Sequence, residues 1–113
     1  MDRGEITVVT SVVTFLEVLV HPIRRGESEL FRKYHDILFY TDLTTVNVTA
    51  SIAEEAARIR AFHKIGAVDS IQMATAINQE ASFLLTNDMR LPSLPHLKVL
   101  TLDEIKTRPE YLQ

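Results

Sequence analysis

Three acidic residues of this sequence lie within or directly after apolar segments. Glu17 lies inside "SVVTFLEVLVHP" (residues 11–22), Asp69 lies inside "IGAVDSIQMATAI" (residues 65–77), and Asp88 follows "FLLTN" (residues 83–87). Carboxylates that gather in one place repel each other unless a cation neutralises them, and Mg²⁺ and Mn²⁺ are hard cations that take oxygen ligands. If the three acids converge, they suit a metal site that activates water for phosphodiester hydrolysis.

Each acid also has an ordinary structural explanation. Glu17 shares one helical face with Thr14 and His21, which together would form a narrow solvent-facing stripe on a buried helix. Asp69 would cap the helix that it opens, and Asp88 would form an Asx-turn after a strand. Taken singly, these explanations are favoured. Only the joint pattern favours a metal site, and physical reasoning on the residues alone does not establish that the three acids meet.

Strands alternate with helices along most of the chain, and these elements must position the acids. The β-branched and apolar segments predict strands over residues 6–10, 44–48, 82–86 and 98–102. Apolar periodicity predicts helices over about residues 11–21, 28–39, 51–64 and 69–80, with a helical turn from residue 103. The alternation predicts an α/β/α sandwich with a parallel sheet, in which strand ends carry the functional groups.

Helix boundaries follow from capping and helix-breaking residues. Pro22 is predicted to end the first helix, and Ser28 to cap the second. The third helix would start at Thr49 or Ser51 and stop at Gly66. Its apolar stripe consists of Ile52, Ala56, Ile59 and Phe62.

Composition limits the protein class. The chain has 113 residues, enough for one domain over residues 1–113, and its 46% hydrophobic content is sufficient for a core. It has no cysteine, which excludes disulfides, thiol catalysis and zinc–thiolate sites and fits a reducing cytoplasm. No apolar run is long enough to span a membrane. The net charge of −3 gives no sign of nucleic-acid binding, although a metal-binding acid cluster would itself lower the net charge.

The ordered set "TSVVTFLEVLV", "GAVDSIQMATAI" and "FLLTNDMRL" resembles the PIN domain, and most closely the VapC-type ribonuclease toxins of toxin–antitoxin pairs. The resemblance covers about residues 5–105. It implies a parallel α/β/α sandwich with an acidic site for Mg²⁺ or Mn²⁺. The residues implied as catalytic and metal-binding are Glu17, Asp69 and Asp88, with Ser11, Thr86 and Asn87 in support.

The sequence departs from the family at its beginning. PIN domains start with an apolar strand that ends in an aspartate, followed by a helix, whereas only "MDRGE" precedes Ile6, and Asp2 follows no strand. By resemblance, the domain is truncated at its N-terminus and lacks a principal metal ligand. The start codon is misassigned, the chain is a fragment, or a short relative closes its sheet by rearrangement or dimerisation. The first two explanations are favoured. Without the central strand, the two halves of the sheet would face a gap of unpaired backbone groups.

The resemblance predicts a metal-dependent endoribonuclease, a toxin that a cognate antitoxin protein holds in check. Tentative RNA contacts are Arg24, Arg25 and Arg90, with Lys64 as a further candidate. Family members are often dimers, so a homodimer is expected by resemblance. The alternative is a catalytically impaired PIN-like module that keeps only protein interactions. A phosphate- or nucleotide-binding module is a weaker third reading, because the sequence has no Gly-rich phosphate loop.

Overall fold

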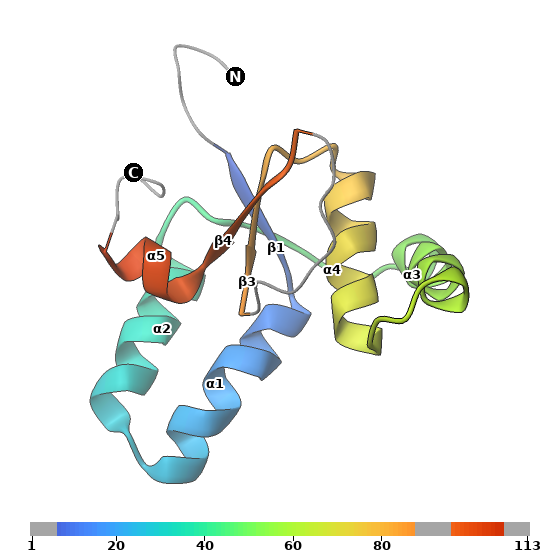
Figure 1. Ribbon diagram of the computed structural model, residues 1–113. Coiled ribbons are helices and arrows are strands. Elements are labelled where there is room, and N and C mark those ends of the chain that lie inside the picture. The colour runs from blue at the N-terminus through green and yellow to red at the C-terminus, as the bar shows by residue number, and fades with distance from the viewer. Residues whose placement is uncertain (1–6, 88–95, 108–113) are drawn as a thin grey trace.

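A parallel sheet organises the part of the chain that the computed structural model describes, residues 7–87 and 96–107 (Figure 1). Its strands are β1 (Val8–Ser11), β2 (Thr44–Val46), β3 (Phe83–Thr86) and β4 (Lys98–Thr101). Within these residues the strand order is β2-β1-β3-β4, and every pairing is parallel. The predicted α/β class with a parallel sheet is therefore confirmed.

Helices cover both faces of the sheet, because neighbouring residues of a strand point to opposite faces. Val8 and Leu85 face a cluster with α1 (Val13–Arg25), α2 (Ser28–Tyr40) and α5 (Leu102–Thr107). The next residue of β1 and the preceding residue of β3, Val9 and Leu84, face the other way and pack against α4 (Ala67–Asn78). The remaining helix, α3 (Ala50–Phe62), packs on α4 through Ile52 and Ala56.

The expectation of a gap in the middle of the sheet is wrong for the part of the chain that the structure describes. β1 pairs directly with β3, with Val8 opposite Phe83 and Val9 opposite Leu84. A buried strand edge without partners would leave backbone N–H and C=O groups unsatisfied, and direct pairing removes that cost.

The first helix does not end at Pro22. Pro22 lies buried inside α1, which continues to Arg25. Proline lacks an N–H group, so it removes one helical hydrogen bond without preventing the turn that follows it. The helix ends at Gly26, whose φ of 67° is left-handed, and the Glu27 N–H then donates to the Pro22 carbonyl at 2.9 Å. This is the usual way in which glycine terminates a helix.

Capping residues settle the other boundaries. Thr49 caps α3, because its hydroxyl accepts a hydrogen bond from the Ile52 N–H at 3.2 Å. Glu27 is the N-cap of α2 and makes no side-chain capping bond, and Ser28 is the first residue of the helix, so the prediction that Ser28 caps it is wrong. Gly66 does not end α3 but is the N-cap of α4, so the prediction that Asp69 caps this helix is wrong.

The predicted apolar stripe of α3 is only partly buried. Phe62 is the last residue of the helix, and 83% of it is exposed. Within the described residues, none of the helices is long and apolar enough to cross a membrane.

Candidate functional site

The first part of α1 brings Glu17 to the carboxyl edge of the sheet. β1 ends at Ser11, and α1 begins two residues later, so Thr14 and Glu17 occupy successive turns at the base of this helix. Thr14 is fully buried. Glu17 is half-buried, and its Oε1 atom is shielded from solvent. The predicted solvent-facing stripe is therefore wrong for Thr14, whereas His21, four residues beyond Glu17, is exposed.

The first turn of α4 holds Asp69. Gly66 caps this helix, so Asp69 is its third residue and is half-buried. A carboxylate in the first turn is favourable, because the helix N-terminus carries partial positive charge. One turn further along, Gln72 is fully buried.

A hydrogen bond joins the two helices that carry these acids. Gln72 Nε2 donates to Thr14 Oγ1 at 2.5 Å. α1 leads away from the carboxyl end of β1, whereas α4 runs back toward the amino end of the sheet (Figure 1). Glu17 follows Thr14, and Asp69 precedes Gln72. Both acids therefore lie on the same side of this bond, beyond the carboxyl edge of the sheet.

The bond between the helices is one link of a buried polar chain that reaches the sheet. The hydroxyls of Thr10 and Thr14 are hydrogen-bonded at 2.8 Å, and the Thr10 hydroxyl bonds the Leu85 carbonyl of β3 at 2.7 Å. Thr10, Thr14 and Gln72 each have 0% exposure. Sequence reasoning did not single out Thr10 or Gln72. The available signal was a polar residue at position 72 within an otherwise apolar helix segment, where an amide must find a partner.

The ends of β1 and β3 supply the supporting residues. Ser11 is buried, and its hydroxyl accepts a weak hydrogen bond from the Val13 N–H at 3.3 Å. Because Val9 lies opposite Leu84, Ser11 of β1 falls level with Thr86 of β3, which is also buried. Asn87 follows and is exposed. Asp88, the third predicted acid, lies outside the described residues.

The oxygen donors fit a hard divalent cation in kind. Glu17 and Asp69 offer carboxylates, and Ser11 offers a hydroxyl, which is the ligand chemistry of Mg²⁺ and Mn²⁺. Over residues 7–87 and 96–107, no group of three or more His, Asp or Glu side chains gathers closely enough to hold a metal ion. The described part of the chain thus supplies two of the three predicted acids, on helices that touch.

Two of the candidate RNA contacts lie away from Glu17, at the other end of α1. Arg24 and Arg25 are exposed in the last turn of α1, about 11 Å along the helix from Glu17 at 1.5 Å per residue. Lys64 is exposed between α3 and α4, and Arg90 lies outside the described residues. Basic residues at a helix C-terminus also have a local explanation, because they oppose the helix dipole.

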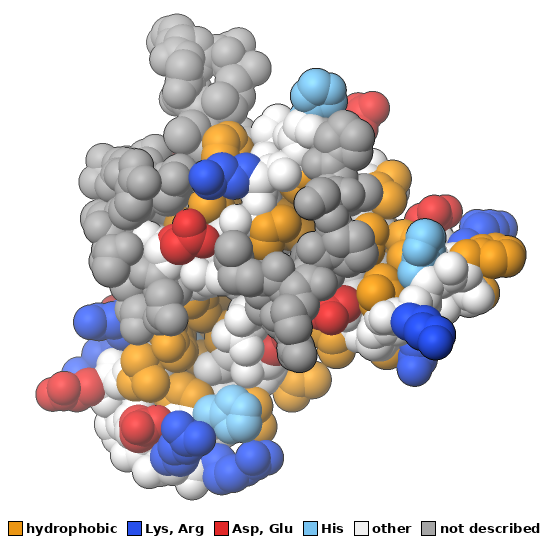
Figure 2. All heavy atoms as spheres, in the orientation of Figure 1, with side chains coloured by type: hydrophobic (Ala, Val, Ile, Leu, Met, Phe, Trp, Pro, Cys, Tyr) orange, Lys and Arg blue, Asp and Glu red, His pale blue; other side chains and the backbone are white. Residues whose placement is uncertain are grey.

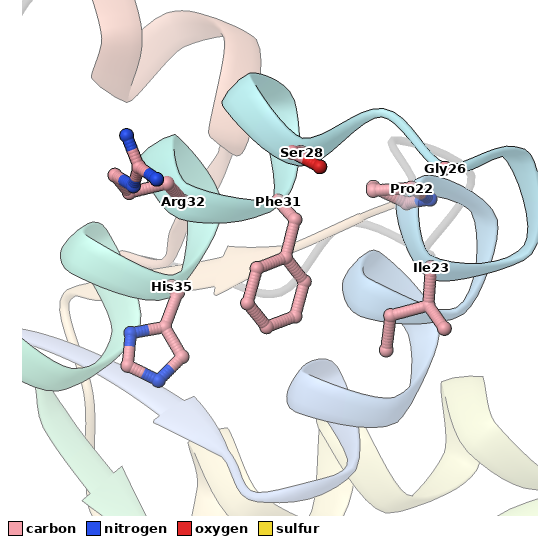
Figure 3. A pocket seen from close by; sticks show the side chains of 7 residues that line it. All are labelled: Pro22, Ile23, Gly26, Ser28, Phe31, Arg32 and His35. Atoms are coloured by element: carbon pink, nitrogen blue, oxygen red, sulfur yellow. The ribbon is translucent and has the colours of Figure 1, made fainter.

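The helical hairpin of α1 and α2 exposes apolar surface. Leu16 is 68% exposed and Ile23 is 63% exposed. A hollow of about 490 Å³ opens between the two helices near their connection, and Figure 3 shows Phe31 and His35 of α2 facing it across from Ile23 of α1. Its full lining is Pro22, Ile23, Gly26, Ser28, Phe31, Arg32 and His35. Figure 2 shows charges of both signs at this end of the molecule, beside hydrophobic side chains.

A parallel α/β/α sandwich with acids beyond the carboxyl ends of its strands defines a class of ligand-binding and catalytic domains. The sequence pattern of the PIN domain family matches residues 2–97, and the chain belongs to that family. PIN domains are generally nucleases.

Among solved structures, one described as a toxin–antitoxin complex from Klebsiella pneumoniae resembles this chain, with a TM-score of 0.58 and 24% sequence identity. The similarity covers 80% of this chain and 70% of that one. At this identity the likeness supports the fold alone. Among curated proteins, none matches the chain significantly.

Proposed function

We propose that this protein is a metal-dependent endoribonuclease of the VapC type, the toxin of a toxin–antitoxin pair, formed by a single PIN domain over residues 1–113. One observation carries the proposal. Two acids in the order expected of a PIN domain, Glu17 and Asp69, stand on helices joined by the Thr14–Gln72 hydrogen bond, on the same side of that bond.

The acids would hold the metal, and neighbouring groups would support them. Glu17, Asp69 and Asp88 are the proposed ligands of Mg²⁺ or Mn²⁺, and Ser11, Thr86 and Asn87 line the same edge of the sheet. When bound, such an ion lowers the pKa of a coordinated water and stabilises charge that develops on the phosphate. The shielded position of Glu17 Oε1 keeps bulk water from competing for that oxygen.

Cationic side chains are the proposed contacts for the RNA backbone. Arg24 and Arg25 are exposed at the end of α1, and Arg90 would join them from the segment after β3. Because the chain is acidic overall, with a net charge of −3, local basic residues have to supply the attraction to phosphates.

Protein partners form the other part of the proposal. The similar structure is described as a toxin–antitoxin complex, which supports a cognate antitoxin, and a homodimer is proposed from the family resemblance. The exposed side chains of Leu16 and Ile23 supply apolar surface on which a protein partner could bury area. A cytoplasmic location is proposed because the chain has no cysteine.

The test is cleavage of end-labelled single-stranded RNA by the purified protein with Mn²⁺ and with excess chelator. We expect cleavage only with Mn²⁺, and a loss of about three orders of magnitude in Glu17→Gln and Asp69→Asn, because each change removes a carboxylate worth several kcal/mol of charge stabilisation. Asp88→Asn tests the acid outside the described residues.

The matched control is Glu54→Gln. Glu54 is an exposed glutamate of α3 that pairs with Arg58 at 2.7 Å, so the same chemical change should leave cleavage intact. Cleavage that persists in chelator, or that Glu17→Gln and Glu54→Gln reduce equally, would contradict the proposal.

The second candidate is a protein-binding module without catalysis, which the exposed apolar surface of the α1–α2 hairpin favours. Calorimetry with Mn²⁺ separates the two. The nuclease predicts a specific binding heat that Glu17→Gln weakens, whereas the binding module predicts no such heat.

A further inference from the structure

The hydroxyl and amide protons of the buried chain can be assigned one by one. A carbonyl only accepts hydrogen bonds, so the single Thr10 hydroxyl proton goes to the Leu85 carbonyl. The proton between the two threonine hydroxyls must then come from Thr14, and Thr14 Oγ1 in turn accepts from Gln72 Nε2. These hydrogen bonds connect α4 to α1, α1 to β1, and β1 to β3 without a break. Each of the three hydrogen bonds then has one donor and one acceptor, and one Gln72 N–H takes part.

This polar chain is a costly way to fill a core. Each of its three side chains is fully buried, where apolar residues of similar volume would pack without desolvating polar atoms. Within the described residues, Gln72 Oε1 is buried and accepts no hydrogen bond, so the amide leaves part of its bonding capacity unused. Unlike apolar packing, these hydrogen bonds fix the distance and orientation of the groups that they join, since hydrogen bonds tolerate little change in distance or angle.

The buried polar chain contacts α1 and α4 one helical turn away from Glu17 and Asp69. Thr14 precedes Glu17 by three residues, and Gln72 follows Asp69 by three, a rise of about 4.5 Å along each helix. A helix backbone is stiff over one turn, so the Thr14–Gln72 hydrogen bond limits how far the backbone segments that carry Glu17 and Asp69 can separate.

We propose that Thr14 and Gln72 are positioning residues that fix the separation of Glu17 and Asp69 for metal binding, with Thr10 anchoring them to β3. This inference rests on the proposed function. An ion binds two carboxylates tightly only when both stand at coordination distance, and groups that orient metal ligands typically change metal affinity by about 10- to 100-fold when they are replaced.

The experiment compares three variants by calorimetric titration with Mn²⁺. Thr14→Val keeps shape but removes the hydroxyl, and we expect Mn²⁺ to bind at least about tenfold more weakly. Thr14→Ser restores the hydroxyl and should bind within about threefold of the unmodified protein, well short of the loss typical for ligand-orienting groups.

Thr75→Val is the matched control. Thr75 is also fully buried, on α4, but its hydroxyl bonds the Ile71 carbonyl of the same helix at 2.8 Å. Thr75→Val therefore removes a buried threonine hydroxyl that bonds within α4 and not to α1, and the Mn²⁺ affinity of this variant should stay unchanged. Equal effects of Thr14→Val and Thr75→Val, or no effect of Thr14→Val, would overturn the proposal.

A second measurement does not depend on metal. The sequence has no cysteine, so Leu16→Cys on α1 and Ala67→Cys on α4, both exposed positions, can carry spin labels without background labelling. Pulsed electron paramagnetic resonance should give a narrow distance distribution that Thr14→Val broadens or shifts and Thr75→Val does not.

The two measurements distinguish a failure of the proposed function from a failure of the positioning role. If the unmodified protein binds no Mn²⁺ but the label distances respond as expected, the proposed function fails and the positioning of the two helices stands. If the distances are the same in all variants, the positioning role is refuted whatever the metal does.

Discussion

The two ends of α1 are built on opposite principles. Near β1, Thr14 is fully buried and hydrogen-bonded to both the preceding strand and α4. Near α2, Ile23 exposes most of its apolar side chain beside a hollow, and the two arginines that follow it are exposed. One end therefore buries polar groups and the other exposes apolar ones. Both arrangements are unfavourable for folding alone, which supports the positioning role proposed for Thr14 at the first end and the partner contact proposed for Ile23 at the second.

The largest predicted effect is on stability. It is a difference between a substitution in the core, near the first end of α1, and the same substitution on the exposed surface of α1. Leu84 is fully buried between β1 and α4, so Leu84→Ala should lower the free energy of unfolding by about 3 kcal/mol in urea denaturation. Leu16, on the exposed side of α1, undergoes the same chemical change in Leu16→Ala, which should cost less than about 0.5 kcal/mol.

Protein concentration sharpens this comparison. If the exposed side of α1 is buried against a second copy of the chain, the cost of Leu16→Ala grows with concentration, because association stabilises the folded state by mass action. A large cost at the lowest concentration would instead show that Leu16 is buried within one chain, against its observed exposure.

The next effect concerns RNA binding at the second end. Arg24→Ala combined with Arg25→Ala should weaken binding of single-stranded RNA by about twentyfold at roughly 0.1 M salt. The magnitude of the slope of log affinity against log salt should fall by about 1.4, two phosphate contacts at about 0.7 each. Fluorescence anisotropy over a salt series measures both quantities.

The control for this double variant lies on α3. Arg58→Ala with Arg60→Ala removes the same charge from exposed helix positions elsewhere. An equal change in slope for both pairs would mean that RNA responds to net charge alone, and the hairpin end would lose its assignment as an RNA contact.

Much of the fold could be predicted because it depends on local pattern. Alternating strand and helix segments predicted the parallel sheet. Hydroxyl residues predicted that α3 starts at Thr49 or Ser51, and Thr49 is its N-cap. The end of α1 was predicted wrongly, because Pro22 removes only its own N–H from the helix and packs buried within it, and the left-handed Gly26 ends the helix instead.

The candidate site was harder to predict for a different reason. Glu17 and Asp69 could be singled out because acids in apolar segments are uncommon. Thr10 and Gln72 could not, because their role exists only in a contact between residues far apart in the sequence, 58 positions in the case of Gln72 and Thr14. A glutamine in an apolar helix signals that it needs a partner but does not identify the partner.

The smallest predicted effect tests how the second end of α1 is terminated. Gly26 has a φ of 67°, and a Cβ there would meet no atom within 4 Å, so any cost of substitution comes from backbone strain and not from a clash. Gly26→Ala should destabilise the protein by about 1 kcal/mol, because alanine disfavours the left-handed region. Gly26→Asn should cost less, since asparagine tolerates that region better. If alanine and asparagine cost the same in urea denaturation, the glycine does not end the helix through its backbone conformation.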